Sequence, residues 1–237
     1  MAIVAHPDDE SLIAGATLAL AATAGVRTGA ISLTRGELGP ISDPFLATPQ
    51  TLASVREGEL HDAAAALGLE WSTCLHEPDG ELEWADEESV VATVAEILAA
   101  DPPAVVLTFG ADGLYHHPDH IAAGRIAGLA LARVGGGVVL EAAWAPGVIV
   151  ELIAAARARG LPSNMWGIEP AAFGSEGPPP ALVVDGTPVL TKKLAAIRAH
   201  RTQLADDHLL THLPDDLAQA FLAREPWRIA SGADHRG

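Results

Sequence analysis

The sequence predicts an α/β fold in which a mostly parallel sheet is flanked by helices. Short apolar runs, typical of buried strands, alternate repeatedly with helix-like segments along residues 1–145. Such alternation is typical of parallel strands joined by right-handed crossovers. With 237 residues and 49% hydrophobic content, the chain can bury a full core. We therefore expect a single domain over residues 1–237, with its core in residues 1–145 and a loop or lid and C-terminal elements in residues 146–237.

Apolar runs and turn residues place the remaining elements in order. We expect strands over residues 2–4, 28–34, 70–75, 104–109 and 136–144. We expect helices over residues 7–25, 51–67, 86–100 and 121–131, of which the third is ended by the Asp-Pro-Pro sequence at 101–103. The C-terminal part should contain a loop or lid over 160–180, a short strand over 181–185, a helix over 192–203, a last helix and short strand within 221–228 and a frayed end over 233–237.

The first strand leads into the sequence Ala-His-Pro-Asp-Asp-Glu at residues 5–10. Pro7 has a fixed φ and no N–H, so it suits the first helical position, with the acidic residues in the first turn. One imidazole and two carboxylates at the end of a strand suit metal binding and proton transfer, although acidic helix starts are also common caps. Because so few residues precede His6, we expect this strand to be edge-like or trimmed.

The same arrangement of a strand, a His-Pro-Asp segment and a helix occurs again in the middle of the chain. The strand at 104–109 leads into Tyr-His-His-Pro-Asp-His at residues 115–120, and a helix follows. Because the carboxyl ends of parallel strands face one edge of a sheet, the two turns can meet there. His6, Asp9 and His120 would then form a metal site with three protein ligands and an open position.

These two segments resemble the signature of the PIG-L/LmbE-like zinc-dependent N-acetylglucosamine deacetylases, which include the mycothiol and bacillithiol pathway deacetylases. Both Ala-His-Pro-Asp-Asp-Glu and His-Pro-Asp-His stand here without substitution. The resemblance implies a Rossmann-like fold with a small C-terminal addition. It also implies that an N-acyl group, most commonly N-acetyl, is removed from an N-acetylglucosamine-type sugar or glycoconjugate.

The resemblance also assigns roles to single residues. The implied zinc ligands are His6, Asp9 and His120. The implied general base is Asp8, and His117, oriented by Asp119, would stabilise the oxyanion or protonate the leaving amine. Physical chemistry agrees, because a catalytic zinc keeps three protein ligands and lowers the pKa of a bound water from about 15.7 to about 7. An imidazole beside the metal can donate to the charge that develops on the amide oxygen, and Tyr115 is placed to assist it.

Three weaker matches suggest substrate contacts, and each has a structural alternative. Glu37 follows a Thr-Arg-Gly sequence, where the family's turn lets the backbone approach the site, but it could be an exposed turn residue. Arg56 matches an Arg-x-x-Glu pair and could bind a sugar hydroxyl or form an ion pair with Glu59 on the same helix face. Asp79 lies in an ordinary Pro-Asp-Gly turn at the same sheet edge and could bind sugar hydroxyls.

Other residues of the C-terminal half are left with two interpretations. Trp166 and Phe173 could stack on a sugar or simply anchor the loop. His200 lies in a segment similar to the family's C-terminal helix, and a structural role fits it equally well. Cys74, the single cysteine, lies in an apolar run and is expected to be buried and inert.

Composition limits the partners and the location. With 14 basic and 31 acidic residues, the net charge of −17 argues against nucleic acid or an anionic membrane and favours a small neutral or cationic substrate. The family resemblance implies that this substrate is a small-molecule glycoconjugate. The sequence has neither a basic leader nor a long apolar run, so we expect a cytoplasmic protein without membrane insertion, which could be a homo-oligomer. Iron(II) or another divalent ion could replace zinc, because two histidines and an aspartate accept several metals.

Other functions remain as alternatives. A nucleotide-binding enzyme would need a Gly-x-Gly-x-x-Gly turn after the first strand, where His6 to Asp9 stand instead. An amidase that acts on another small acyl-amide would use the same site. A non-catalytic sugar-binding module would tolerate the loss of Asp8 and His117, and both are present.

Overall fold

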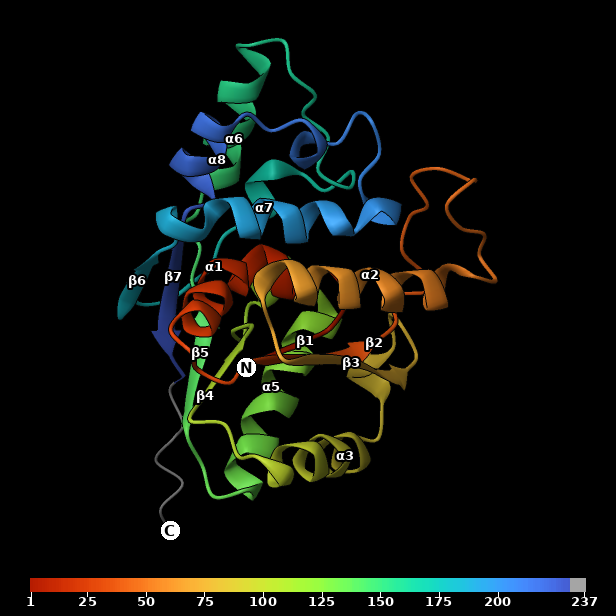
Figure 1. Ribbon diagram of the computed structural model, residues 1–237, viewed down its shortest axis with the longest axis vertical. Helices are drawn as coiled ribbons and strands as arrows, with labels where there is room; N and C mark the ends of the chain where they lie inside the picture. The colour runs from red at the N-terminus through yellow and green to blue at the C-terminus, as the bar shows by residue number, and fades with distance from the viewer. Residues whose placement is uncertain (231–237) are drawn as a thin grey trace.

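The computed structural model describes residues 1–230, which fold around one seven-stranded sheet (Figure 1). The strands are β1 (Ala2–Val4), β2 (Gly29–Thr34), β3 (Trp71–Glu77), β4 (Val105–Thr108), β5 (Val138–Ala142), β6 (Leu182–Asp185) and β7 (Arg224–Ile229). Their order across the sheet is β3-β2-β1-β4-β5-β7-β6. The first five strands are parallel, and β7 runs antiparallel to both of its neighbours. The predicted α/β fold with a mostly parallel sheet is confirmed.

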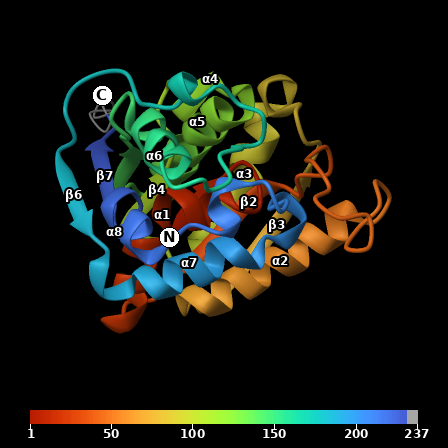
Figure 2. The same cartoon turned by 90° about the horizontal axis from the view of Figure 1, so that it is seen from above.

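Helices cover both faces of the sheet. They are α1 (Asp9–Thr23), α2 (Leu52–Leu67), α3 (Glu87–Ala100), α4 (Gly113–His116), α5 (Pro118–Arg133), α6 (Val148–Arg157), α7 (Leu190–Ala199) and α8 (Asp215–Phe221). Figure 1 shows α3 and α5 below the sheet and α1 and α2 above it. Helix α7 packs on α1 and α2 and lies alongside α2 in Figure 2. The C-terminal half therefore adds a layer over the side of the sheet that α1 covers.

The hydrophobic core lies on both faces of the sheet, as the alternating directions of strand side chains require. Ile3 packs in the cluster under α3 and α5, and Val4 packs in the cluster under α1. Because both faces of the sheet are covered, every side chain of the central strands β1 and β2 is buried. Cys74 is buried, and burial raises the pKa of its thiol to about 12, which fits the predicted inert role.

The position of the first strand differs from the expectation. Strand β1 lies between β2 and β4 in the middle of the sheet, so the edge-like alternative is wrong, whereas its length of 3 residues agrees with the trimmed alternative. Short strands are common at edges, yet β1 is fully buried because both neighbours and both helical layers cover it. Helix α1 begins at Asp9, two residues later than the predicted first helical position at Pro7.

The C-terminal half departs from the expected elements in two places. The apolar segment Val148–Arg157 forms α6, which our sequence interpretation did not include. The last helix, α8, ends at Phe221 instead of following it, whereas β7 matches the expected short strand. The end predicted to be frayed, residues 233–237, lies outside the described residues.

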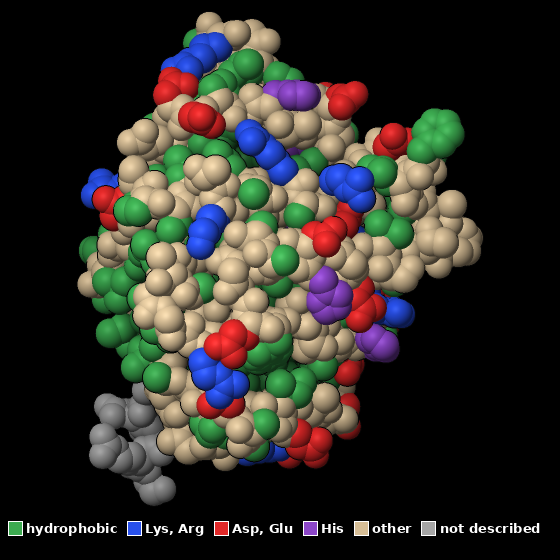
Figure 3. Space-filling model, viewed as in Figure 1, with side chains coloured by type: hydrophobic (Ala, Val, Ile, Leu, Met, Phe, Trp, Pro, Cys, Tyr) green, Lys and Arg blue, Asp and Glu red, His purple; other side chains and the backbone are tan. Residues whose placement is uncertain are grey.

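Among residues 1–230, no helix is long and apolar enough to cross a membrane. Acidic and basic side chains are interspersed on the face shown in Figure 3, where no extended basic patch is visible. The cytoplasmic location, the lack of a nucleic-acid partner and the homo-oligomer stay predictions.

Candidate active site

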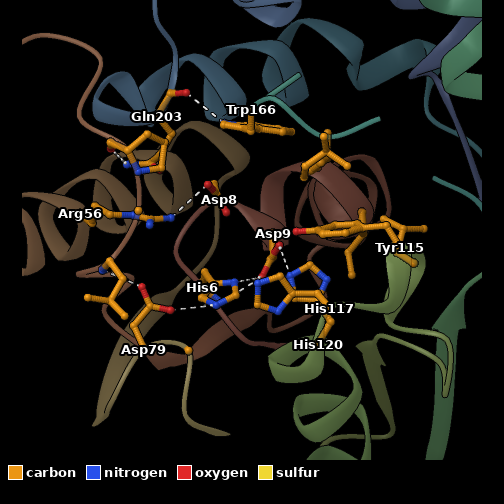
Figure 4. A pocket seen from close by; sticks show the side chains of 18 of the residues that line it. His6, Asp8, Asp9, Arg56, Asp79, Tyr115, His117, His120, Trp166 and Gln203 are labelled. Carbon is orange, nitrogen blue, oxygen red and sulfur yellow. Dashed lines mark hydrogen bonds and ion pairs between the residues drawn. The ribbon is translucent and has the colours of Figure 1, made fainter. Parts of the chain in front are cut away.

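The two His-Pro-Asp segments meet at the carboxyl edge of the sheet, where β1 and β4 are neighbours (Figure 4). The first segment follows β1 and opens α1, and the second follows β4 and opens α5. Both line one pocket, together with the loops after β2 and β3, the segment between α6 and β6, and the chain after α7. The ionisable residues that line the pocket include His6, Asp8, Asp9, Asp79, His117 and His120.

Asp9 lies between the two histidines that are its predicted fellow ligands. Oδ2 of Asp9 is 3.4 Å from Nδ1 of His6, and Oδ1 is 3.4 Å from Nε2 of His120. All three side chains are largely buried, and one ligand atom from each lies within 4.8 Å of the other two. Metal–ligand bonds of about 2.0–2.2 Å span such separations, so one divalent ion fits among them. The structure thus brings the predicted ligand set together.

The hydrogen bonding of His120 supports a metal ligand at this position. Nδ1 of His120 is 3.1 Å from the carbonyl oxygen of Gly113, so Nδ1 carries the proton and Nε2 carries the lone pair. Nε2 is buried and has no hydrogen-bond partner among the described residues. Burial lowers the pKa of His120 to about 3, although Asp9 favours its cation. A neutral imidazole with a buried, unpaired nitrogen offers the donor that a divalent metal requires.

Two carboxylates contact the far side of the His6 ring. Nε2 of His6 is 3.1 Å from Oδ1 of Asp79 and 3.4 Å from Oδ2 of Asp119. A proton on Nε2 is donated to these oxygens and leaves the lone pair of Nδ1 on the side of Asp9. Burial acts to lower the pKa of His6, but Asp119, Asp79 and Asp9 outweigh it and raise that pKa. Carboxylates in this position orient a ligating histidine and increase its basicity.

Asp8 has an unusual backbone conformation, with φ of 128° at the start of α1. A residue with a side chain rarely adopts such an angle, which costs about 1–3 kcal/mol. The N–H of Asp8 donates to Oε2 of Glu10 at 3.0 Å, and Nη2 of Arg56 donates to Oδ2 of Asp8 at 3.0 Å. Burial raises the pKa of the Asp8 carboxyl to about 6 against the opposite effect of Arg56. Asp8 is therefore a pocket-lining carboxylate whose pKa suits proton transfer near neutral pH.

Arg56 joins the loops around Asp8 instead of pairing with its helix neighbour. Nη1 donates to the carbonyl oxygen of Gly36 at 2.7 Å, and Nη2 donates to that of Pro7 at 2.5 Å. A Cβ on Gly36, whose φ is +65°, would collide with the guanidinium, which explains the glycine in this turn. Glu59 accepts from the N–H and hydroxyl of Thr202, so the alternative of an Arg56–Glu59 ion pair is wrong.

His117 precedes α5, and its Nδ1 accepts from the backbone N–H of Asp119 at 3.2 Å. The Asp119 carboxylate accepts instead from the N–H groups of Gly80 at 2.8 Å and Leu82 at 3.1 Å, and it faces His6. The predicted orientation of His117 by Asp119 is therefore corrected, because the backbone makes the contact. Since Nδ1 accepts, neutral His117 carries its proton on Nε2. Burial and the charge of His6 lower the pKa of His117, which favours this neutral form.

Tyr115 lies against the histidines of the second segment. Its ring centroid is 5.7 Å from that of His117 and 5.0 Å from that of His120. Burial raises the pKa of Tyr115 well above its usual value, so the hydroxyl keeps its proton. Figure 4 shows this hydroxyl directed toward Asp9 and the centre of the site.

The other predicted substrate contacts fall into two groups. Arg56, Asp79 and Tyr115 line the pocket, whereas Glu37 is not among its lining residues. Oε1 of Glu37 accepts from the N–H of Asp79 at 3.1 Å, and Oδ2 of Asp79 accepts from the N–H of Leu38 at 2.8 Å. Glu37 thus supports the loop that carries Asp79.

The outer wall of the pocket comes from segments whose role the sequence left open. Trp166 and Phe173 line it from the segment between α6 and β6, and Gln203 lines it from the chain after α7. Nε1 of Trp166 donates to the carbonyl oxygen of Gln203 at 3.0 Å, and the N–H of Gly174 donates to that of Leu114 at 2.9 Å. These bonds make the segment a wall of the pocket. Its aromatic residues were the one signal for this role in the sequence.

The chain matches the family profile described as PIG-L, GlcNAc-PI de-N-acetylase, over residues 1–131, which is more than half of its length. The chain belongs to the PIG-L family. The matched region contains both His-Pro-Asp segments, so the resemblance on which the sequence interpretation depends is confirmed. The predicted reaction class, hydrolysis of an N-acyl group on an N-acetylglucosamine-type substrate, is confirmed with it.

Relatives and solved structures extend the match over nearly the whole chain. The 1D-myo-inositol 2-acetamido-2-deoxy-alpha-D-glucopyranoside deacetylase of Kineococcus radiotolerans is 36% identical over 251 residues, which cover 86% of this chain and 68% of the relative. The structure of N,N'-diacetylchitobiose deacetylase from Pyrococcus horikoshii matches with a TM-score of 0.68 and 23% identity, covering 97% of this chain and 82% of that one.

A protein with another reaction shares this fold. The 4-carboxy-2-hydroxymuconate hydratase GalB from Pseudomonas putida matches with a TM-score of 0.68 and 18% identity, covering 97% of this chain and 95% of that one. These structural matches show the fold alone, because a fold can support several reactions. The chemistry of this PIG-L protein depends on the residues of its site.

Proposed function

We propose that this PIG-L protein is a zinc-dependent deacetylase that releases acetate from an N-acetylglucosamine unit of a small glycoconjugate. One observation carries the proposal: the buried group of His6, Asp9 and His120, with an unpaired nitrogen on His120, shares its pocket with the carboxylate of Asp8, a residue whose backbone is strained. A metal-ligand set next to a proton acceptor is what hydrolysis of an unactivated amide requires.

The donors of the site favour zinc. His6, Asp9 and His120 would hold the metal through two nitrogens and one carboxylate, and three protein ligands leave a position open. Iron(II) binds the same donors, so the working ion follows availability as well as affinity. When bound, the metal supplies Lewis acidity, which lowers the pKa of water and polarises the amide carbonyl.

Asp8 is assigned as the general base and, afterwards, as the acid. Its carboxylate takes a proton from the attacking water, whose oxygen forms a bond to the amide carbon. It then gives this proton to the departing nitrogen as the carbon–nitrogen bond breaks, so that acetate and an amine result. A pKa near 6 leaves Asp8 ionised at neutral pH, and Arg56 holds one carboxylate oxygen.

His117 is assigned to the amide oxygen. The sequence left two roles open, oxyanion stabilisation and protonation of the amine. Because Nδ1 accepts from the Asp119 N–H, the neutral ring has its N–H at Nε2 and can donate a hydrogen bond. A lowered pKa makes His117 a poor source of a full proton, so the geometry supports oxyanion stabilisation. The hydroxyl of Tyr115 offers a second hydrogen-bond donor beside His117.

The apolar part of the pocket lining favours an uncharged substrate. It includes Leu38, Pro40, Trp166, Ile168 and Phe173. Among the charged lining residues, His6 contacts Asp9 and Asp79, and Arg56 contacts Asp8. A neutral glycoside therefore fits this pocket better than a sugar phosphate, whose charge would lack a partner on the apolar wall.

The test is the release of primary amine from a panel of N-acetylglucosaminides by zinc-loaded protein. The panel contains methyl, inositol and N-acetylglucosamine aglycones, N-acetylglucosamine 1-phosphate and simple non-sugar acetamides. Asp8→Asn serves as the blank, because it should keep zinc and lose about 10²–10⁴ of the rate. Release from the non-sugar amides alone would replace the proposal with a general amidase. Sugar binding without any release would indicate a binding module.

A further inference from the structure

His200, which the sequence left without a role, contacts the first segment of the site from the far end of the chain. It stands directly after α7, and its side chain is buried. Nε2 of His200 is 2.9 Å from Oε1 of Glu10, whose side chain is fully buried. The two residues therefore form a buried ion pair between the start of α1 and the end of α7.

The carboxylate of Glu10 connects His200 to Asp8 through hydrogen bonds. Its Oε1 also accepts from the hydroxyl of Ser11 at 2.5 Å, and its Oε2 accepts from the N–H of Asp8 at 3.0 Å. His200 thus fixes the carboxylate that holds the backbone of Asp8. The backbone angle φ of Asp8, which this hydrogen bond helps to hold, is 128°. A residue other than glycine adopts such a strained angle only when its surroundings enforce it.

We propose that His200 and Glu10 act as a positioning pair, which holds Asp8 in its strained conformation so that its carboxylate faces the substrate. The inference rests on the proposed role of Asp8 as the base. Arg56 fixes the carboxylate of Asp8 from one side, and the pair fixes its backbone from the other. The charged groups acting on His200 are Glu10, Asp8 and Arg56.

A second buried ion pair on α7 has a structural role and serves as a comparison for the pair of His200 and Glu10. Nζ of Lys193 is 2.6 Å from Oε1 of Glu225, and both side chains are 1% exposed. Glu225 accepts from the N–H groups of Ala16 and Thr17 within α1 and lies outside the lining of the pocket. Buried ion pairs contribute little net stability, so the two pairs are distinguished by what their carboxylates hold. Glu10 accepts a hydrogen bond from Asp8 in the pocket, whereas Glu225 accepts hydrogen bonds from residues of α1 outside it.

The experiment compares three zinc-loaded variants with the wild type. His200→Leu removes the donor, His200→Gln keeps a donor for Glu10, and Lys193→Met removes the other buried pair of the same helix. A base displaced by about 1 Å costs on the order of 100-fold in rate, so we expect kcat of His200→Leu to fall by about that factor with little change in KM. We expect His200→Gln to recover most of this loss and Lys193→Met to lower Tm alone.

Two further readouts separate positioning from packing. The zinc content of His200→Leu should stay the same, because His200 contacts Glu10 and not the proposed metal ligands. A crystal structure of His200→Leu should show Asp8 away from its present φ. Wild-type kcat in His200→Leu would overturn the proposal, as would loss of zinc from that variant.

The crystal structure also separates this inference from the proposed function. Retention of the strained Asp8 conformation in His200→Leu would overturn the positioning role whatever the activity. Wild-type protein that deacetylates no member of the panel would instead refute the proposed function. If His200→Leu does not fold, the kcat and Asp8 conformation of His200→Gln decide, because that variant should keep both.

Discussion

The carboxylate of Asp119 offers the sharpest structural prediction, because one buried group performs two tasks. It accepts from the N–H groups of Gly80 and Leu82, and it faces Nε2 of His6 at 3.4 Å. In Asp119→Ala the N–H of Leu82 loses its partner in a buried position, at a cost of about 1–3 kcal/mol. The bond from the more exposed Gly80 adds about 1 kcal/mol. We therefore expect the metal-free protein to lose about 2–4 kcal/mol of unfolding free energy.

The same substitution should weaken metal binding. Loss of a carboxylate behind a ligating histidine typically costs 10–100-fold in affinity. Asp79 still contacts Nε2 of His6 at 3.1 Å, so we expect the lower end of that range, about tenfold. Stability is measured by urea unfolding of the metal-free protein, and affinity is measured by zinc competition with a chelating dye.

Asp62→Ala is the matched control, because it removes an exposed carboxylate from α2 and should change neither quantity. Loss of stability in Asp119→Ala with unchanged zinc affinity would refute the assignment of Asp119 as an orienting group for His6. It would then be an anchor for the loop after β3 only.

Three further predictions concern other parts of the chain. Asp9→Ala should bind no zinc at equimolar metal, and full occupancy by elemental analysis would show that the ligand set is wrong. Burial lowers the pKa of His208 to about 4, so the folded state keeps it neutral while the unfolded imidazole protonates near pH 6.5. The unfolding free energy should therefore fall by about 3 kcal/mol as the pH is lowered from 6.5 toward 4. Urea unfolding at several pH values should show a smaller fall for His208→Asn, and an equal fall in both proteins would contradict this prediction. Trp166→Ala should raise KM about 2–10-fold for glycosides with a cyclic aglycone and leave the methyl glycoside nearly unchanged, whereas equal effects on both would exclude an aglycone contact.

Local sequence was sufficient to predict that the three proposed metal ligands lie together. His6, Asp9 and His120 belong to short segments that directly follow apolar strands, and the geometry of parallel sheets brings such segments to one edge. Prediction of the fold succeeded for the same reason, since helices and strands alternate with clear boundaries. The prediction of an edge position for β1 was wrong because the length of a strand does not determine which strands lie beside it.

Contacts between distant loops could not be predicted. The carboxylate of Asp119 turns to the loop after β3 instead of to His117, and this choice depends on where Gly80 and Leu82 lie. The contact between Glu10 and His200 joins residues 190 positions apart and depends on how α7 packs on α1. No spacing in the sequence records either packing arrangement.

The most direct test of a metal-dependent deacetylase is a zinc titration of metal-free protein while amine and acetate are measured together. The substrate is the best glycoside of the panel, and Asp9→Ala is the control. We expect both products to appear in equal amounts and activity to rise in proportion to zinc until one ion is bound per chain. Full activity in the metal-free protein, or activity that requires a second ion, would contradict a single site formed by His6, Asp9 and His120.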